Sequence, residues 1–244
     1  MKKRRVGPVS ICVLDQPRAI VRILAKVEAA RPIIVTFCNA HTVNVAAKDH
    51  EFARVLERSL VLNDGVGVDL ASRLLFGRPF PANLNGTDFI PALLGSARSE
   101  LRLFLLGSAP GVAEKAGEAL KELGPGHRIV GTHHGFFSMV DEATLRTRIL
   151  EANPNFILVG MGQPRQELWA GRNSESFPAV TMCVGAFLEF ASGAAKRAPT
   201  WMRSARIEWL YRLVREPQRL WRRYLIGNVV FMARVFRERA SRTR

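Results

Sequence analysis

Asp64 lies in the stretch LNDGVGV (residues 62–68), between an apolar run and a glycine. Asp-Gly is a common turn dipeptide, because Asp bonds its own backbone and Gly tolerates positive φ. A carboxylate that follows a strand and precedes a helix starting near Val66 is also placed to act as a general base, a role that contributes roughly 10²–10⁴-fold in rate. A helix cap there would contribute about 1 kcal/mol. These roles are compatible, and we predict that Asp64 is both turn and base.

Further polar side chains follow the other predicted strands. In an open parallel sheet, ligands bind beyond the carboxyl ends of the strands. None of these side chains is needed for a hydrophobic core, so we expect them to converge on one edge of the sheet. They are Asn39 and His41 after residues 33–37, Ser108 after 102–107, Gln163, Arg165 and Gln166 after 155–160, and Glu189 after 179–185.

The loop GSAPG, residues 107–111, leads from a strand into a helix. Its backbone N–H groups, including those of Gly107 and Ser108, could hold a phosphate or a polar sugar. The loop is neither a Walker sequence nor a GxGxxG fingerprint. A simple strand-to-helix turn explains it equally well, so both interpretations stay open.

The sequence contains no strong metal-binding motif. Cys12, Cys38 and Cys183 are far apart and lack metal-ligand spacing, which a reduced, cytosolic setting explains most simply. His133 and His134 are adjacent, and neighbouring side chains on a strand point to opposite faces, so these two cannot easily share an ion. No third ligand lies at a matching spacing. We expect no metal site and no cofactor.

Short apolar runs alternate with amphipathic segments along residues 1–195. Continuous apolar strands that alternate with helices predict an α/β fold, with a mostly parallel sheet covered by helices on both faces. We expect strands near 33–38, 61–62, 102–107, 127–132, 155–160 and 179–185, and helices over 16–30, 66–76, 87–98, 110–122, 141–152 and 163–173.

The bulk composition is that of a globular protein with anionic partners. The 244 residues are 48% hydrophobic and 23% charged, with a formal net charge of +15. That charge points to nucleotide phosphates, nucleic acid or an acidic membrane surface. The basic N-terminus is followed by a short apolar run cut by Pro8, Asp15 and Pro17, so we expect no cleavable signal. No run of about 18 apolar residues predicts a transmembrane helix.

The character of the chain changes near residue 196. Residues 197–244 contain 13 arginines and three acids, a net charge of +10 out of the chain's +15. Three of the four tryptophans and both tyrosines are also here. We expect only helices, with Pro217 in the first turn of a new one. The sequence therefore predicts a core over residues 1–195 and a helical appendage over residues 196–244.

Arginines recur in the appendage at steps of three and four, at positions 212, 215, 219 and 222. On a continuous helix this spacing forms one stripe, although Pro217 would offset its halves. The opposite positions are rich in Trp, Leu, Ile and Val, and a basic amphipathic helix of this kind is typical of a membrane surface. A solvated basic face and a bidentate grip on a diphosphate are the other interpretations.

Eight ordered segments of the chain resemble the WecG/TagA/CpsF glycosyltransferases of bacteria, glycosyltransferase family 26, over about residues 30–225. Eight segments in order are far more specific than any one motif. They are NAHTVNVA (39–46), LNDGVGVDLAS (62–72), NGTDFIP (85–91), FLLGSAPGVAEKA (104–116), IVGTHHGFF (129–137), VGMGQPRQELW (159–169), VGAFLEFASGAAKRAP (184–199) and EWLYRLVREPQR (208–219).

The resemblance implies a Rossmann-like α/β core and a basic helical appendage that docks on the membrane and closes the active site. It also implies an inverting, metal-independent enzyme on the inner face of the bacterial plasma membrane. Such an enzyme moves a hexose-type sugar from a UDP-sugar to a polyprenyl-diphosphate-linked sugar in cell-surface polysaccharide biosynthesis. A homo-oligomer is left open.

By the same resemblance, Asp64 corresponds to the family's proposed catalytic base. Asn39 and Gln166 correspond to active-site polar residues, and Glu189 falls where a relative has Asp. The arginines expected to hold the UDP diphosphate are Arg212, Arg219 and Arg222, whose fixed charge would meet the developing charge of the leaving group. The remaining residues predicted to bind substrate are Thr36, His41, Gly107, Ser108, Gln163 and Arg165.

The chain departs from some relatives at one point. Where these have Thr-Pro-Asn-Ala, this chain has Phe37-Cys38-Asn39-Ala40. Thr36 is the residue that could replace the missing threonine. The NAHTVN form is more similar to enzymes of exopolysaccharide or enterobacterial common antigen assembly, so the donor is left open between N-acetylmannosamine, its uronic acid and glucose.

Two other classes of protein make different demands on the sequence. A nucleic-acid-binding protein would explain the net charge, but it predicts basic residues spread over a known recognition module, and none is present. A nicotinamide-dependent oxidoreductase predicts a glycine fingerprint after the first strand, where this chain has LDQPRA. We therefore favour the glycosyltransferase and keep the nucleic-acid-binding α/β protein as the alternative.

Overall fold

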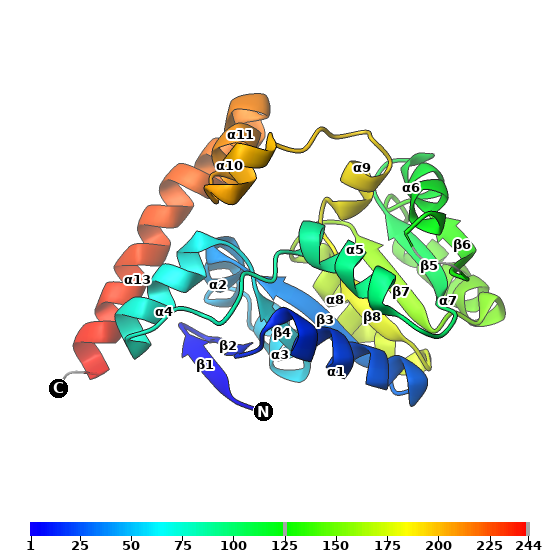
Figure 1. Ribbon diagram of the computed structural model, residues 1–244, viewed down its shortest axis with the longest axis horizontal. Coiled ribbons are helices and arrows are strands. Elements are labelled where there is room, and N and C mark those ends of the chain that lie inside the picture. The colour runs from blue at the N-terminus through cyan, green and yellow to red at the C-terminus, as the bar shows by residue number, and fades with distance from the viewer. Residues whose placement is uncertain (124–125, 243–244) are drawn as a thin grey trace.

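The computed structural model describes residues 1–123 and 126–242, and its centre is a six-stranded sheet (Figure 1). The strand order is β4-β3-β8-β7-β5-β6, and every neighbouring pair is parallel. The predicted α/β fold with a parallel sheet is confirmed. The strands are β3 (Ile33–Cys38), β4 (Leu60–Asn63), β5 (Arg102–Gly107), β6 (Arg128–His133), β7 (Phe156–Gly160) and β8 (Val180–Cys183).

Helices cover both faces of the sheet, because successive strand side chains point to opposite sides. On β5, Leu103 and Leu105 pack in one hydrophobic cluster, whereas Phe104 and Leu106 pack in another. The first face is covered by α1 (Gln16–Glu28), α5 (Gly86–Ser96), α6 (Val112–Lys121) and α9 (Phe187–Ala191). The second is covered by α2 (Ala40–Ala46), α3 (His50–Arg58), α4 (Val66–Phe76), α7 (Met139–Ala152) and α8 (Arg165–Asn173).

The helices that the sequence predicted are all present close to their expected ranges. The prediction did not include α2, α3, α9 or the short 3-10 turn at Ser174–Ser176. An antiparallel hairpin of β1 (Lys3–Val6) and β2 (Val9–Cys12) precedes the sheet. It packs its apolar side chains in one cluster with α2, α4 and the last helix of the chain.

The region after residue 196 is helical, as predicted. It contains α10 (Thr200–Ser204), α11 (Glu208–Arg215), α12 (Pro217–Trp221), a π-helical turn η2 (Arg222–Ile226) and α13 (Gly227–Arg242). Pro217 occupies the first turn of α12, which confirms its predicted place. The segment between α9 and α10 leads away from α9 to the C-terminal helices, of which α13 lies beside α4 (Figure 1).

The last helix is part of a shared hydrophobic core. Phe231 and Val235 of α13 are 1% and 0% exposed, and they pack in the cluster formed by the hairpin, α2 and α4. The domain boundary at residue 195 therefore remains a prediction, because α13 shares a hydrophobic core with residues before it. Within the described ranges 1–123 and 126–242, every helix is too short or too polar to cross a membrane.

Candidate active site

The sheet register brings Asn39 and Asp64 together. Cys38, at the end of β3, is paired with Asn63, at the end of β4, so the next residue on each strand falls at the same edge. The Asp64 N–H continues the ladder by donating to the Cys38 carbonyl at 2.8 Å. The Asn39 side-chain amide donates to Asp64 Oδ2 at 3.3 Å. Two residues 25 positions apart thus form one polar pair.

The start of α2 fixes which way the Asn39 amide points. Asn39 is the N-cap of this helix, and its Oδ1 accepts from the N–H groups of His41 and Thr42 at 3.0 and 3.2 Å. Thr42 Oγ1 accepts from the Asn39 N–H in return, which completes a capping box. Because the amide oxygen is occupied, the amide nitrogen is the atom that faces Asp64.

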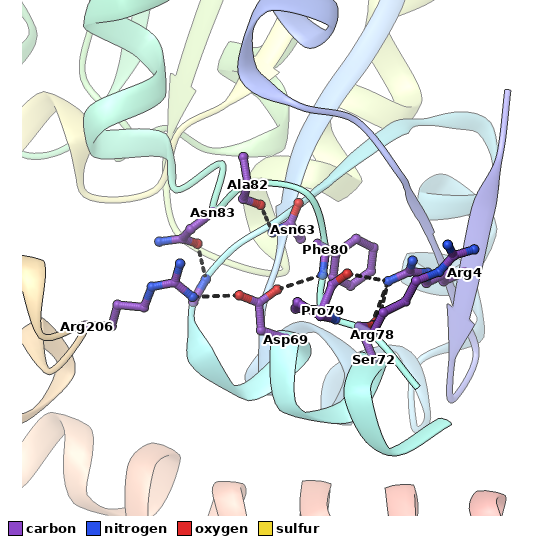
Figure 2. Close-up of polar contacts among 11 residues, drawn as sticks. Arg4, Asn63, Asp69, Ser72, Arg78, Pro79, Phe80, Ala82, Asn83 and Arg206 are labelled. Atoms are coloured by element: carbon purple, nitrogen blue, oxygen red, sulfur yellow. Dashed lines mark hydrogen bonds and ion pairs between the residues drawn. The ribbon is translucent and has the colours of Figure 1, made fainter. Parts of the chain in front are cut away.

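The turn after β4 is held by the loop of residues 77–85, which returns from the end of α4 (Figure 2). Asn63 donates its side-chain amide to the Ala82 carbonyl at 2.6 Å. The Gly65 N–H donates to Asn83 Oδ1 at 2.8 Å. The residues on both sides of position 64 are therefore anchored to one loop.

Asp64 forms the predicted turn but does not cap the following helix. Gly65 is the N-cap of α4, with a φ of 85° that glycine tolerates best, and no side chain caps this helix. The cap that the sequence suggested for Asp64 is therefore wrong. The reason is that the glycine turns the backbone after the aspartate, which leaves its carboxylate at the edge of the sheet beside Asn39.

The carboxyl of Asp64 is half-buried, and its pKa is raised above the ordinary value. Burial is the largest cause, because it penalises the charged form. The hydrogen bond from Asn39 and the charges of Arg223 and Arg212 oppose this effect, and Asp88 adds to it. A carboxyl with a raised pKa that is still near two cations has the properties of a general base.

The two arginines that face Asp64 come from the C-terminal helices. Neither the Arg212 nor the Arg223 side chain forms a hydrogen bond or an ion pair within the part of the chain that the structure describes, and Arg223 Nε is buried. Burial lowers the pKa of Arg223, and the charge of Arg212 lowers it further, whereas Asp64 raises it. Two neighbouring guanidinium groups that share only the charge of Asp64 and form no ion pair with it are suited to bind a further anion.

The sequence did not predict Arg223. Its neighbour Arg222 fits the stripe of a continuous helix, but the helix is interrupted between Arg215 and Arg223. Glu216 leaves helical geometry with a φ of −131° and a ψ of 58°, and a π-helical turn begins at Arg222. π-turns are frequent at functional sites. The doublet of arginines in LWRRYL was the one sequence signal for this residue.

Arg222 and Arg219 have other neighbours. Arg222 is exposed and its guanidinium lies over the ring of Trp221, 5.3 Å from the centroid. Arg219 is exposed and forms an ion pair with Glu216 at 2.6 Å, although its charge still acts on Arg223. The structure thus brings Arg212 and Arg223 to Asp64 more directly than the other two.

A buried polar group lies under the site, between β3 and α8. Thr36, Gln163 and Gln166 all donate to Oε1 of Glu167, at 2.9, 3.2 and 2.9 Å. Gln166 is 2% exposed, and its oxygen accepts from the N–H groups of Gly162 and Gly185 at 3.1 Å each. Gln166 therefore ties the loop after β7 to the loop after β8.

The GSAPG loop passes close to β7. The Ser108 N–H donates to the Gly160 carbonyl at 2.9 Å, and a Cβ at Gly107 would collide with the same carbonyl. Ser108 has a φ of 59°, and its Oγ is buried without a partner among the described residues. This loop is the predicted turn into α6, and it leaves one hydroxyl available to a ligand.

Two carboxylates, the buried Asp69 of α4 and the exposed Asp88 of α5, form ion pairs with the start of the C-terminal helices. Asp69, 5% exposed, accepts from the Phe80 N–H at 3.3 Å and forms an ion pair with Arg206 at 2.7 Å (Figure 2). Asp88 forms ion pairs with Arg197 at 2.8 Å and with Arg203 at 3.8 Å. The segment that leads to Arg212 and Arg223 is thus attached to α4 and to α5.

Comparison with known proteins decides the family. A family model described as "Glycosyl transferase WecG/TagA/CpsF family" matches residues 4–244. This chain belongs to that family. A Bacillus subtilis relative named N-acetylglucosaminyldiphosphoundecaprenol N-acetyl-beta-D-mannosaminyltransferase is 33% identical over 195 residues, 79% of this chain and 75% of the relative. A Staphylococcus aureus relative with the same name is 32% identical over 211 residues, 85% of this chain and 81% of the relative.

The chain is therefore a glycosyltransferase, and the prediction of the WecG/TagA/CpsF family is confirmed. In this family member, the predicted residues fall into three groups. Asn39, Asp64 and Arg212 meet at the edge of the sheet. Thr36, Gln163 and Gln166 form the buried group around Glu167, a residue that the sequence did not single out.

The remaining predicted residues lie around that edge with separate contacts. Arg165 is exposed, lies over the ring of Phe137 and donates to its carbonyl at 3.2 Å. Glu189 is half-buried in the first turn of α9. The pKa of His41 is lowered to about 4 by burial and by the charge of Arg223, so its imidazole is neutral at pH 7. Among residues 1–123 and 126–242, no group of three or more His, Cys, Asp and Glu side chains could hold a metal ion.

Proposed function

We propose that this glycosyltransferase moves an N-acetylmannosamine-type hexose from a UDP-sugar to N-acetylglucosamine carried on a polyprenyl diphosphate, in the synthesis of a cell-surface polysaccharide. The names of the relatives support the acceptor and the sugar. The uronic acid of N-acetylmannosamine and glucose remain alternative donors. The observation that carries the proposal is the half-buried Asp64, held by Asn39 and faced by two arginines that form no ion pair within the described residues.

The reaction is a single displacement with inversion. An acceptor hydroxyl oxygen attacks the anomeric carbon of the donor, while the bond from that carbon to the β-phosphate oxygen breaks. Asp64 takes the hydroxyl proton, and UDP leaves. Burial moves the pKa of Asp64 upward, toward neutral pH, and a base whose pKa lies nearer the working pH accepts a proton more readily.

Arg212 and Arg223 stabilise the diphosphate that leaves. Negative charge grows on the β-phosphate as the bond breaks, and fixed cations aimed at developing charge lower the barrier. Arg212 lies over the ring of Phe190 and Arg223 over that of Tyr224, but neither donates a hydrogen bond to an acceptor among the described residues. This supports the role, since a bound diphosphate would supply acceptors. In this proposal, the guanidinium groups provide the positive charge, and no metal ion is required.

Other residues at the edge bind the rest of the donor. The Ser108 hydroxyl, whose oxygen is buried without a partner among the described residues, lies in the loop that leads into α6, where an anion or a polar sugar is favoured. Glu189 and Arg165 lie beyond the strands β8 and β7 and contribute to specificity for the sugar or nucleotide.

The C-terminal helices place the enzyme on the inner face of the plasma membrane, where its lipid-linked acceptor lies. Large apolar side chains are exposed among the arginines of this region, which supports contact with a membrane surface. Each arginine near an anionic leaflet contributes about 1 kcal/mol. The exposed side chains include Trp201, Val214, Leu225, Val229 and Phe236.

The proposal is tested by sugar transfer from a panel of UDP-sugars to a lipid-linked N-acetylglucosamine acceptor, with EDTA present. We expect wild-type transfer from one donor and a loss of about 10²–10⁴-fold in Asp64→Asn, with UDP binding retained. Asp15→Asn is the matched control, because Asp15 caps α1 and asparagine caps helices equally well. Full activity in Asp64→Asn would refute the role of this carboxylate.

A further inference from the structure

Glu167 is a buried carboxyl that the reaction described above does not use. It is 0% exposed, and three donors converge on its Oε1 atom, whereas Oε2 is buried without a partner in the described ranges. Burial raises the pKa of this group, and the donated hydrogen bonds oppose the shift. A buried carboxyl is expensive unless it is hydrogen-bonded, and here three donors satisfy one of its two oxygens.

The bonds to Glu167 determine the orientation of the Gln163 amide. Gln163 Nε2 donates to Glu167 at 3.2 Å and to the Phe37 carbonyl at 3.1 Å. Both neighbours are acceptors, so a flipped amide would place its oxygen against two other oxygens. The Gln163 oxygen is therefore held toward Thr42, whose hydroxyl donates to it at 3.0 Å.

The hydrogen bonds that begin at Glu167 and Gln163 extend through Thr42 to Asn39 and Asp64. The Thr42 hydroxyl has three acceptors within reach, and the Gln163 oxygen at 3.0 Å is nearer than the Phe37 carbonyl and Asn39 Oδ1, both at 3.3 Å. The Thr42 oxygen in turn accepts the Asn39 N–H at 3.0 Å. That bond is half of the capping box that keeps the Asn39 oxygen on the start of α2 and its nitrogen on Asp64. Glu167 thus favours one arrangement of the bonds at Gln163 and Thr42, which adds to the backbone N–H groups of His41 and Thr42 in orienting Asn39.

We propose that Glu167 is a positioning residue, which acts through Gln163 and Thr42 to orient the Asn39 amide against Asp64. The inference rests on the proposed function of Asp64 as the base. Glu167 itself touches no substrate. Its contribution is to keep the hydrogen bond from Asn39, which stabilises the ionised form of Asp64.

The test compares Glu167→Met, which removes the acceptor at similar volume, with Glu167→Gln, which retains one acceptor oxygen. In Glu167→Met we expect kcat to fall by about 10- to 100-fold with little change in KM for the donor. The acid limb of the pH–rate profile moves to higher pH, because Asp64 loses part of the Asn39 bond. Glu167→Gln restores most of the activity and the wild-type limb.

A carboxyl ¹³C NMR titration measures the same effect without substrate. The Asp64 signal is assigned by its absence in Asp64→Asn. We expect its pKa to rise in Glu167→Met and to stay at the wild-type value in Glu167→Gln. Glu175→Met is the control, because Glu175 is exposed and pairs only with Arg58 among the described residues, so the Asp64 signal should not change.

An unchanged Asp64 pKa in folded Glu167→Met would overturn the inference. If that variant does not fold, Thr42→Val interrupts the chain of bonds at its middle and is expected to raise the Asp64 pKa; no rise there would be equally contradictory. A wild-type enzyme that transfers no sugar would refute the proposed function alone. The titration would still show whether Glu167 controls Asp64.

Discussion

The edge of the sheet and the C-terminal helices contribute to the site in opposite ways. At the edge, Asn39, Gln163 and Gln166 have their amide groups engaged by named neighbours, and each bond fixes the direction of the next. In the helices, Arg212 and Arg223 have no such partners within the described ranges, and large apolar side chains are exposed. The polar groups of one region satisfy one another, whereas in the proposed function the arginines of the other region receive their acceptors from a ligand.

The edge of the sheet therefore contributes fixed geometry, and the C-terminal helices contribute positive charge. If Asp64 is the base, as proposed, the edge holds it in a single arrangement before substrate binds, which reduces the reorganisation needed during the reaction. The helices bring cations that repel each other until an anion arrives. Changes at the edge should therefore alter the rate and its pH dependence, whereas changes in the helices should alter donor affinity and leaving-group stabilisation.

The largest expected effect separates two adjacent arginines. Arg223→Ala should lower kcat/KM by about 10²–10³-fold, because it removes a cation aimed at the leaving group. Arg222→Ala is the matched control and should change kcat/KM only a few-fold, since Arg222 is exposed over Trp221. Steady-state kinetics of the two variants decide the point. A larger loss of kcat/KM in the Arg222 variant would instead support the sequence prediction that Arg222 holds the diphosphate.

The next effect concerns the amide at the edge. Asn39→Ala should lower kcat by about tenfold or more and raise the pKa of Asp64, because the base loses its hydrogen bond. It should also destabilise the fold by about 1 kcal/mol through the lost cap. Asn85→Ala is the control, since Asn85 caps α5 and donates to Asp88 in the same way. Equal loss of kcat in both variants would mean that Asn39 matters only as a cap.

A smaller effect tests how the two regions are joined. Arg206→Gln should lower the free energy of unfolding by about 1 kcal/mol, because it leaves the buried Asp69 with one partner fewer while Arg206 itself is partly exposed. Urea denaturation measures this change. Arg215→Gln is the control and should leave the free energy of unfolding unchanged, and an equal loss in both would show that the Asp69 contact contributes nothing.

The smallest effect is a gain in stability. The folded-state pKa of Asp64 is raised, so ionisation of this carboxyl opposes folding at neutral pH. Asp64→Asn should therefore unfold at a temperature a few degrees higher than wild type at pH 7. The difference should disappear as the pH falls below the unfolded-state pKa of about 3.9. Calorimetry at several pH values measures it, and a lower unfolding temperature at pH 7 would contradict the raised pKa.

Much of the fold followed from local sequence patterns. Continuous apolar strands such as 102–107 and 155–160 identified the parallel sheet, and the polar residues after the strands indicated the edge at which Asn39 and Asp64 meet. The helix α2 was missed because NAHTVNVA is rich in β-branched residues, and its capping box depends on tertiary contacts of Thr42. Glu167 was missed because its donors come from separate elements, β3 and the loop before α8.

The arginine assignment shows a second limit of the sequence. A stripe at steps of three and four assumes a regular helix, and two backbone irregularities invalidate that assumption here. The break at Glu216 and the π-helical turn from Arg222 rotate the later residues, so that Arg223 faces Asp64. Such irregularities are set by the packing of α12 and α13 on the core, which periodicity alone does not encode.

The pH dependence of kcat/KM, measured for wild type and Arg223→Ala, tests most directly whether Asp64 is a base shaped by both regions. We expect an acid limb above the ordinary aspartate pKa of about 3.9, because burial raises the pKa of Asp64. In Arg223→Ala the limb should move to still higher pH, because a charge that favours the carboxylate is lost. A limb at the ordinary value, or one that is the same in both proteins, would contradict this account.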